Sequence, residues 1–96
     1  MTMSEIRVCR PHGTTLKHAR KGAEHIAEEL GEEFGLDHAW EGNTLRFKRM
    51  GVSGYIEVGK KDVEIEVKLG FLLMALGPRI EHEINRFCDE NFGPVS

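Results

Sequence analysis

The sequence contains few cysteines and no long hydrophobic run, and both shortages restrict the class of protein that it can encode. Cys9 and Cys88 lie far apart and form neither a CxxC nor a zinc-type spacing. Because no signal peptide or dense disulfide pattern is present, we expect free thiols in a reducing cytoplasm. The longest apolar run, Phe71 to Leu76, is far shorter than the roughly 20 residues of a membrane-spanning helix. A soluble, cytoplasmic protein is therefore expected.

The sequence also lacks the motifs of the common catalytic and metal sites. No Gly-rich phosphate loop is present, and no HxxxH pair occurs because His18 and His25 are seven residues apart and His82 is isolated. Ser53 has no nearby base in sequence, and neither cysteine has a partner that would activate it. We therefore expect no metal, no cofactor and no catalytic residue, and the case for an enzyme is weak.

Charge is modest in total but segregated along the chain. The net charge of −3 disfavours general nucleic-acid binding. Residues 1–21 carry five Lys/Arg against one acid, residues 22–41 carry seven acids and no Lys/Arg, and residues 42–61 carry five Lys/Arg against one acid. Such blocks either keep exposed faces soluble or form a binding patch.

The stretch from Leu36 to Gly54 predicts a β-hairpin with a defined register. Gly42-Asn43 is typical of a two-residue type II′ turn, and the apolar faces of the two flanking strands then coincide. We expect Gly51 to Gly54 to form a second, glycine-bounded turn. The predicted cross-strand pairs are Trp40 with Leu45, His38 with Phe47, Leu36 with Arg49 and Asp37 with Lys48.

Hydrophobic periodicity predicts two amphipathic helices and five strands in the order β-α-β-β-β-β-α. Short connections between the last four strands favour an antiparallel sheet, and both helices must bury their apolar stripes against it. We therefore expect one α+β domain over residues 1–96, a two-layer sandwich resembling a miniature helix-grip arrangement, with frayed ends at 1–4 and 94–96. The predicted strands are 5–10, 36–41, 44–49, 55–58 and 63–69; one helix runs from Thr14 or Thr15 to Gly35, and the other from Gly77 to Gly93.

Two groups of polar residues are candidate ligand sites. Arg10 and His12 fall between a strand end and a helix N-terminus, where free backbone N–H groups could help to hold a phosphate or carboxylate. Lys48, Arg49 and Ser53 combine two cations with a hydroxyl beside a predicted turn. Arg49 falls on the predicted apolar face, so it needs a carboxylate, a ligand or a position at the rim. The structural alternative for both groups is a turn with solvated charges.

The apolar run before the second helix is a third candidate. One interpretation is a buried link between the last strand and the last helix. The other is an apolar patch that meets a hydrophobic surface, a protein partner or an acyl chain. The residues concerned are Phe71, Leu72, Leu73 and Met74.

Several short motifs, in order over nearly the whole chain, are shared with one bacterial family. They are Ile6-Arg7-Val8, Arg10-Pro11-His12, Glu28-Glu29-Leu30, Trp40-Glu41-Gly42, Phe47-Lys48-Arg49, Gly51-Val52-Ser53-Gly54, Leu69-Gly70 and Leu72-Leu73. On these motifs the chain resembles the polyhydroxyalkanoic acid system proteins, small bacterial proteins whose genes are associated with polyester-granule synthesis. The resemblance implies a link to polyhydroxyalkanoate metabolism or granules, and it brings no activity, ligand or catalytic residue with it.

Three functional hypotheses follow. The first is a non-enzymatic accessory protein of the polyhydroxyalkanoate system that binds a granule protein, the granule surface or an acyl-type ligand. The alternative is a protein or enzyme that binds a small anionic ligand of the acyl-thioester type with the basic residues around Arg10 and Arg49. Nucleic-acid binding through the cations of 7–21 and 46–61 is the weakest, because the net charge is acidic. A homodimer formed through a strand edge or the apolar run is compatible with the pattern.

Overall fold

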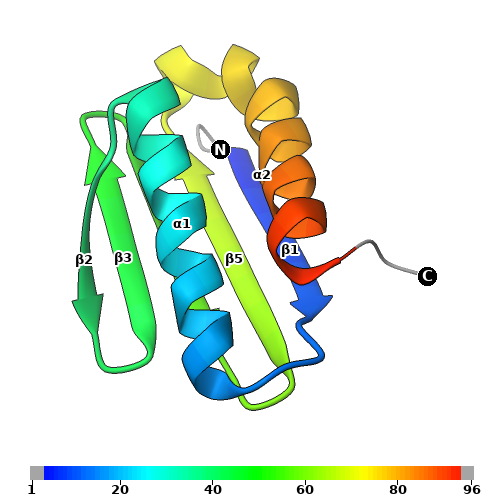
Figure 1. Ribbon diagram of the computed structural model, residues 1–96. Helices are drawn as coiled ribbons and strands as arrows, with labels where there is room; N and C mark the ends of the chain where they lie inside the picture. The colour runs from blue at the N-terminus through cyan, green and yellow to red at the C-terminus, as the bar shows by residue number, and fades with distance from the viewer. Residues whose placement is uncertain (1–3, 94–96) are drawn as a thin grey trace.

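The structure, a computed structural model, describes residues 4–93 and forms a five-stranded antiparallel sheet with two long helices (Figure 1). The strand order across the sheet is β1-β5-β4-β3-β2. This is the α+β fold and the element order that the periodicity predicts, with a short 3-10 helix, η1, added before the last helix. The elements are β1 (Ser4–Pro11), α1 (Leu16–Phe34), β2 (Asp37–Glu41), β3 (Thr44–Arg49), β4 (Val52–Val58), β5 (Asp62–Leu69), η1 (Phe71–Leu76) and α2 (Gly77–Phe92).

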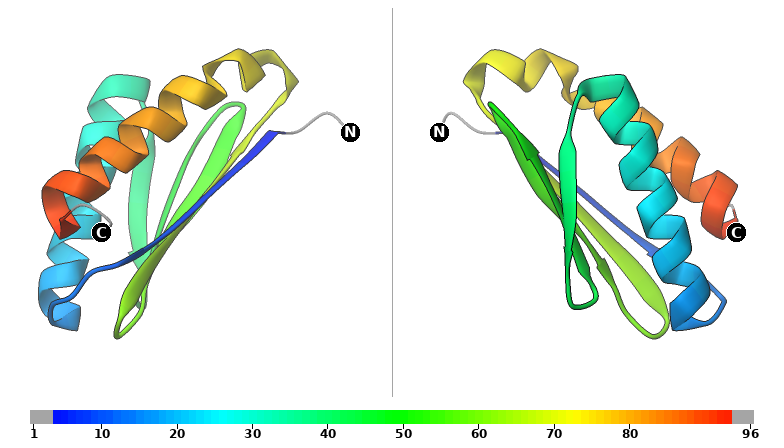
Figure 2. Two further views of the ribbon diagram at one scale, coloured as in Figure 1. Left: turned by 90° about the vertical axis from the view of Figure 1, so that its right-hand side faces the viewer. Right: turned by 60° about the vertical axis from the view of Figure 1, so that its left-hand side comes forward.

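Both long helices cover the same face of the sheet, and the other face carries no helix (Figure 2). We call this uncovered side the open face. β1 forms one edge beside β5, and α1 connects it to β2 at the opposite edge. Ala19, Ala23 and Ala27 are buried along α1, and small side chains in this stripe let the helix approach the sheet closely. The core therefore lies between the helices and one face of the sheet.

The first hairpin has the predicted register. Trp40 pairs with Leu45, His38 with Phe47 and Asp37 with Lys48. Gly42, the first central residue of the turn, has φ +64°. Within residues 4–93 no non-glycine residue has positive φ, so Asn43 has negative φ, and this combination is typical of a type II′ turn. The predicted pair of Leu36 with Arg49 lies outside the ladder, because β2 begins at Asp37.

The prediction of a second turn over Gly51 to Gly54 is wrong. The turn consists of Met50 and Gly51 alone, and β4 begins at Val52 instead of Tyr55. Gly54 lies inside β4, where a Cβ would approach the Glu66 backbone oxygen to 2.2 Å. Gly54 therefore serves a close approach between strands, which a sequence pattern cannot distinguish from a turn.

The ends of the elements follow the predicted capping residues. Thr15 accepts a hydrogen bond from the backbone N–H of His18 at 3.2 Å, and Gly35, with φ +70°, ends α1. Ser4, predicted to be frayed, pairs with Leu69 as the first residue of β1. The other predicted frayed residues, 1–3 and 94–96, lie outside the described part of the chain.

Candidate functional site

Arg10, a predicted ligand residue, binds α2 instead of facing solvent. Its guanidinium Nη2 lies 2.8 Å from a carboxylate oxygen of Asp89 and donates to the side-chain oxygen of Asn85 at 3.2 Å. Arg10 lies on the helix-covered face of β1, the same face as buried Ile6 and Val8, and is only 7% exposed. Because its donors are used by α2, Arg10 fastens the first strand to the last helix.

His12 makes two internal hydrogen bonds. Its Nδ1 accepts the backbone N–H of Thr14 at 3.1 Å, so Nε2 carries the proton and donates to the carbonyl oxygen of Gly59 at 2.8 Å. Both ring nitrogens are therefore used by a neutral imidazole that is 5% exposed. His12 joins the β1–α1 connection to the β4–β5 turn.

The remaining residues of the two polar groups lie on opposite faces of the sheet. Arg49 lies at the rim of the helix-covered face and donates to the carbonyl oxygen of Phe34, which satisfies a free acceptor at the C-terminus of α1. Lys48 and Ser53 are paired neighbours on the open face. The five predicted residues are thus not brought together, and only Lys48 and Ser53 share one surface.

The apolar run Phe71–Leu76 forms η1, which lies at the same end of the molecule as the β3–β4 turn (Figure 1). The backbone N–H of Gly70 donates to the carbonyl oxygen of Gly51 at 2.8 Å. Leu73 packs against the core, and a Cβ at Gly51 would lie 2.9 Å from its Cδ1. The turn and η1 therefore form one continuous surface.

This surface carries all the exposed large hydrophobic side chains of the described residues. Met50 is 93% exposed, Met74 is 39% exposed and Leu76 is 36% exposed. We call these three residues, together with half-buried Leu73, the apolar end. The side chains of the predicted Phe71 and Leu72 lie outside what the structure describes.

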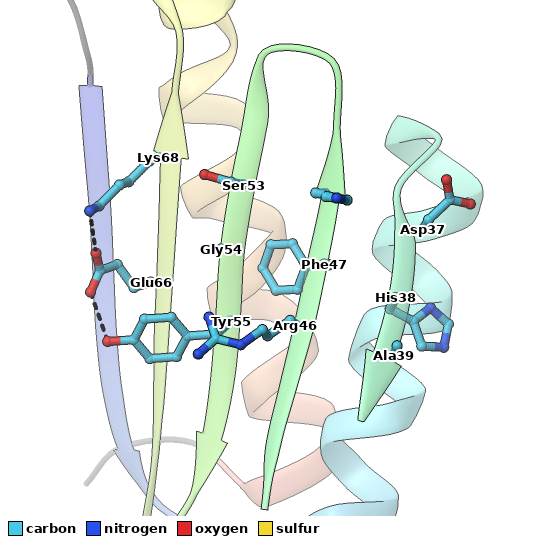
Figure 3. A pocket seen from close by; sticks show the side chains of 11 residues that line it. Asp37, His38, Ala39, Arg46, Phe47, Ser53, Gly54, Tyr55, Glu66 and Lys68 are labelled. Carbon is cyan, nitrogen blue, oxygen red and sulfur yellow. Dashed lines mark hydrogen bonds and ion pairs between the residues drawn. The ribbon is translucent and has the colours of Figure 1, made fainter. Parts of the chain in front are cut away.

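The open face contains a second polar arrangement, centred on Glu66 (Figure 3). The Tyr55 hydroxyl donates to Glu66 Oε2 at 2.8 Å, Arg7 donates to the same oxygen at 3.0 Å, and Lys68 Nζ lies 3.6 Å from Oε1. The hydrogen bond from Tyr55, aided by Arg7 and Lys68, holds the pKa of Glu66 below its ordinary value. The same bond is the main cause that raises the pKa of Tyr55 to about 12. Glu66 is therefore a carboxylate whose charge is balanced by its neighbours.

Because Tyr55 is the only tyrosine, its titration can be followed directly by the absorbance of the phenolate. We expect a midpoint of about 12 in the folded chain, compared with 10.0 for an ordinary tyrosine. The stabilisation from this hydrogen bond is complete below pH 10 and is lost as the pH rises through about 12. In Glu66→Gln the midpoint should move toward 10.0, and an unchanged midpoint would contradict the assigned cause.

Sequence reasoning missed six residues of these surfaces: Met50, Leu76, Arg7, Tyr55, Glu66 and Lys68. The predicted strands 55–58 and 63–69 already contain the pair of Tyr55 with Glu66, whereas a start of β4 at Tyr55 leaves out the pair of Ser53 with Lys68. Met50 could have been found as the non-glycine residue of a two-residue turn, a position that leaves its side chain exposed.

Comparison with known proteins gives one informative result. No curated protein and no solved structure is significantly similar to the chain. Within residues 4–93, neither long helix combines the length and the apolar character needed to cross a membrane. Residues 6–92 match the sequence model of a family described as "Putative polyhydroxyalkanoic acid system protein". The chain therefore belongs to the polyhydroxyalkanoic acid system protein family.

Proposed function

We propose that this chain is a non-catalytic accessory protein of the polyhydroxyalkanoate system and that it binds the polyester granule surface through its apolar end. The proposal depends on one observation: Met50, Met74 and Leu76, the exposed large hydrophobic residues of the described chain, gather at one end. A cluster of this kind is typical of a surface that meets an apolar partner. The family description, which refers to a polyhydroxyalkanoic acid system, supports a polyester as this partner.

The chemistry of the apolar end suits an irregular surface. Methionine has an unbranched, polarizable side chain that adapts its shape to what it contacts, and two of the three exposed residues are methionines. Burying one such side chain contributes about 1.5–3 kcal/mol. Several of them acting together can therefore hold a small protein on an apolar surface without an enclosed pocket.

An acyl-type ligand fits this end less well than a surface does. The cavity beneath it, lined in part by Leu73, Leu76 and Ile80, has a volume of only about 20 Å³. Small-molecule pockets typically have volumes of about 300–1,000 Å³. The apolar groups of Met50 and Met74 also face outward, which favours contact with an extended surface over insertion of a chain.

Co-sedimentation of the purified protein with isolated polyester granules over a salt series tests the proposal. An unrelated soluble protein of similar net charge serves as the control. We expect the chain, but not the control, to be retained at high salt, because apolar contacts are not screened by ions. Retention that disappears as salt is raised, or no retention at all, would overturn binding through the apolar end.

A further inference from the structure

The open face of the sheet contains a hollow that the granule-binding proposal does not use. It spans β2 to β5, has a volume of about 480 Å³ and is lined by residues that include Lys48, Ser53, Tyr55 and Lys68 (Figure 3). This volume falls within the range of about 300–1,000 Å³ that is usual for small-molecule sites. The hollow lies in a regular sheet, so its lining residues are held by the backbone ladder.

The register places two lysines on either side of a serine. Lys48 pairs with Ser53 across β3 and β4, and Ser53 pairs with Lys68 across β4 and β5. Adjacent strands are about 4.8 Å apart, so the two lysine Cα atoms are separated by about 10 Å. Because a lysine side chain is long and flexible, both ammonium groups can reach one group held above Ser53.

The positive charge of this row is only partly balanced. Within the described residues, no carboxylate lies within 4.0 Å of the Lys48 ammonium, although Asp37 is its cross-strand neighbour. Lys68 lies 3.6 Å from Glu66, but that carboxylate already accepts hydrogen bonds from Tyr55 and Arg7. Tyr55 remains a neutral phenol at ordinary pH, so it does not repel an anion.

We propose that the hollow binds a phosphate monoester, whose phosphate group is held by the ammonium groups of Lys48 and Lys68 and by the hydroxyl of Ser53. Lysine ammonium groups act as point charges that suit the oxygens of phosphate, whereas a planar carboxylate is better matched by an arginine fork. The nearest arginine in the hollow, Arg46, donates its Nε to Glu41 at 3.1 Å. Ala39 and the Tyr55 ring offer apolar contact to the organic part of the ester.

A titration of the full chain with n-butyl phosphate, followed by amide chemical shifts in NMR spectra at constant ionic strength, tests this site. Inorganic phosphate and butyrate are titrated in parallel. We expect saturable shifts centred on Lys48, Ser53 and Lys68, with n-butyl phosphate binding more tightly than inorganic phosphate and butyrate binding most weakly. Equal binding of butyrate would overturn the assignment to phosphate.

A pair of double variants separates a built site from general attraction by charge. Lys48→Gln/Lys68→Gln should weaken binding at least about tenfold, because hydrogen bonds to charged groups are lost. Lys60→Gln/Lys61→Gln removes the same charge from exposed residues of the β4–β5 turn and should leave binding unchanged. Equal weakening by both pairs, or shifts that do not saturate, would overturn the site. Because granules are absent from this assay, its outcome is independent of the proposed function.

Discussion

Replacing Gly54 by alanine is expected to lower the free energy of unfolding by about 3 kcal/mol, at the upper end of the usual cost of overpacking. A Cβ at this position would lie 2.2 Å from the backbone oxygen of Glu66 and 2.8 Å from Cε2 of the buried Phe47 ring. The backbone oxygen belongs to the neighbouring strand, so relieving the clash requires β4 and β5 to separate. Urea unfolding, followed by the fluorescence of the single tryptophan, measures the change.

Gly22→Ala provides a matched control. A Cβ at Gly22 would lie 2.6 Å from Cε1 of Phe92, which is the far end of a half-buried side chain and can move. Alanine is also a better helix former than glycine by about 1 kcal/mol. We therefore expect a change within about 1 kcal/mol. Equal losses of stability in the two variants would show that backbone proximity at Gly54 is not the cause.

Met50→Asp/Met74→Asp is expected to reduce salt-resistant retention on polyester granules at least about tenfold, since two apolar contacts are replaced by charges that must stay hydrated. Both side chains are exposed, so the free energy of unfolding should change little. Co-sedimentation at high salt measures retention, and urea unfolding verifies that the fold is intact.

The control for this variant places the same charge at the opposite end of the molecule. Thr14→Asp/His18→Asp changes two exposed residues beside the start of α1, far from η1 (Figure 1). If charge alone governed retention, this variant would be released from granules as well. We expect it to be retained like the unaltered chain.

Local signals in the sequence predicted the fold well. The turn at Gly42-Asn43 and the alternation around it fixed the register of the first hairpin, because a shift by one residue would have exposed its apolar face. The caps Thr15 and Gly35 bounded α1 in the same way. The predicted turn at Gly54 is wrong because a glycine in a strand and a glycine in a turn look alike in sequence. What distinguishes them is the partner strand β5, which arrives later in the chain.

The candidate sites were harder to predict, because burial of a polar residue depends on distant parts of the chain. The position of Arg10 and His12 before a helix predicts ligand residues, and the sequence does not indicate that Asp89 and the Gly59 carbonyl lie beside them. The row of Lys48, Ser53 and Lys68 requires Ser53 to lie in β4, whereas the predicted strand begins at Tyr55. Met50 lies in a turn outside the continuous apolar run, so a search for apolar runs does not find it.

The most direct test of granule binding through the apolar end is an environment-sensitive fluorophore attached at position 50 by way of Met50→Cys. Exposed Cys9 is replaced by serine so that it is not labelled. Cys88 is buried, and burial raises the pKa of its thiol to about 11, so this thiol should resist labelling. A second variant carries the label at the opposite end through Lys60→Cys.

On adding granules at high salt, we expect the emission of the label at position 50 to shift to the blue, because its surroundings become apolar. The emission of the label at position 60 should stay the same as it is without granules, because this label remains in water. A blue shift at position 60 alone, or none at position 50 while the protein sediments with the granules, would contradict binding through the apolar end.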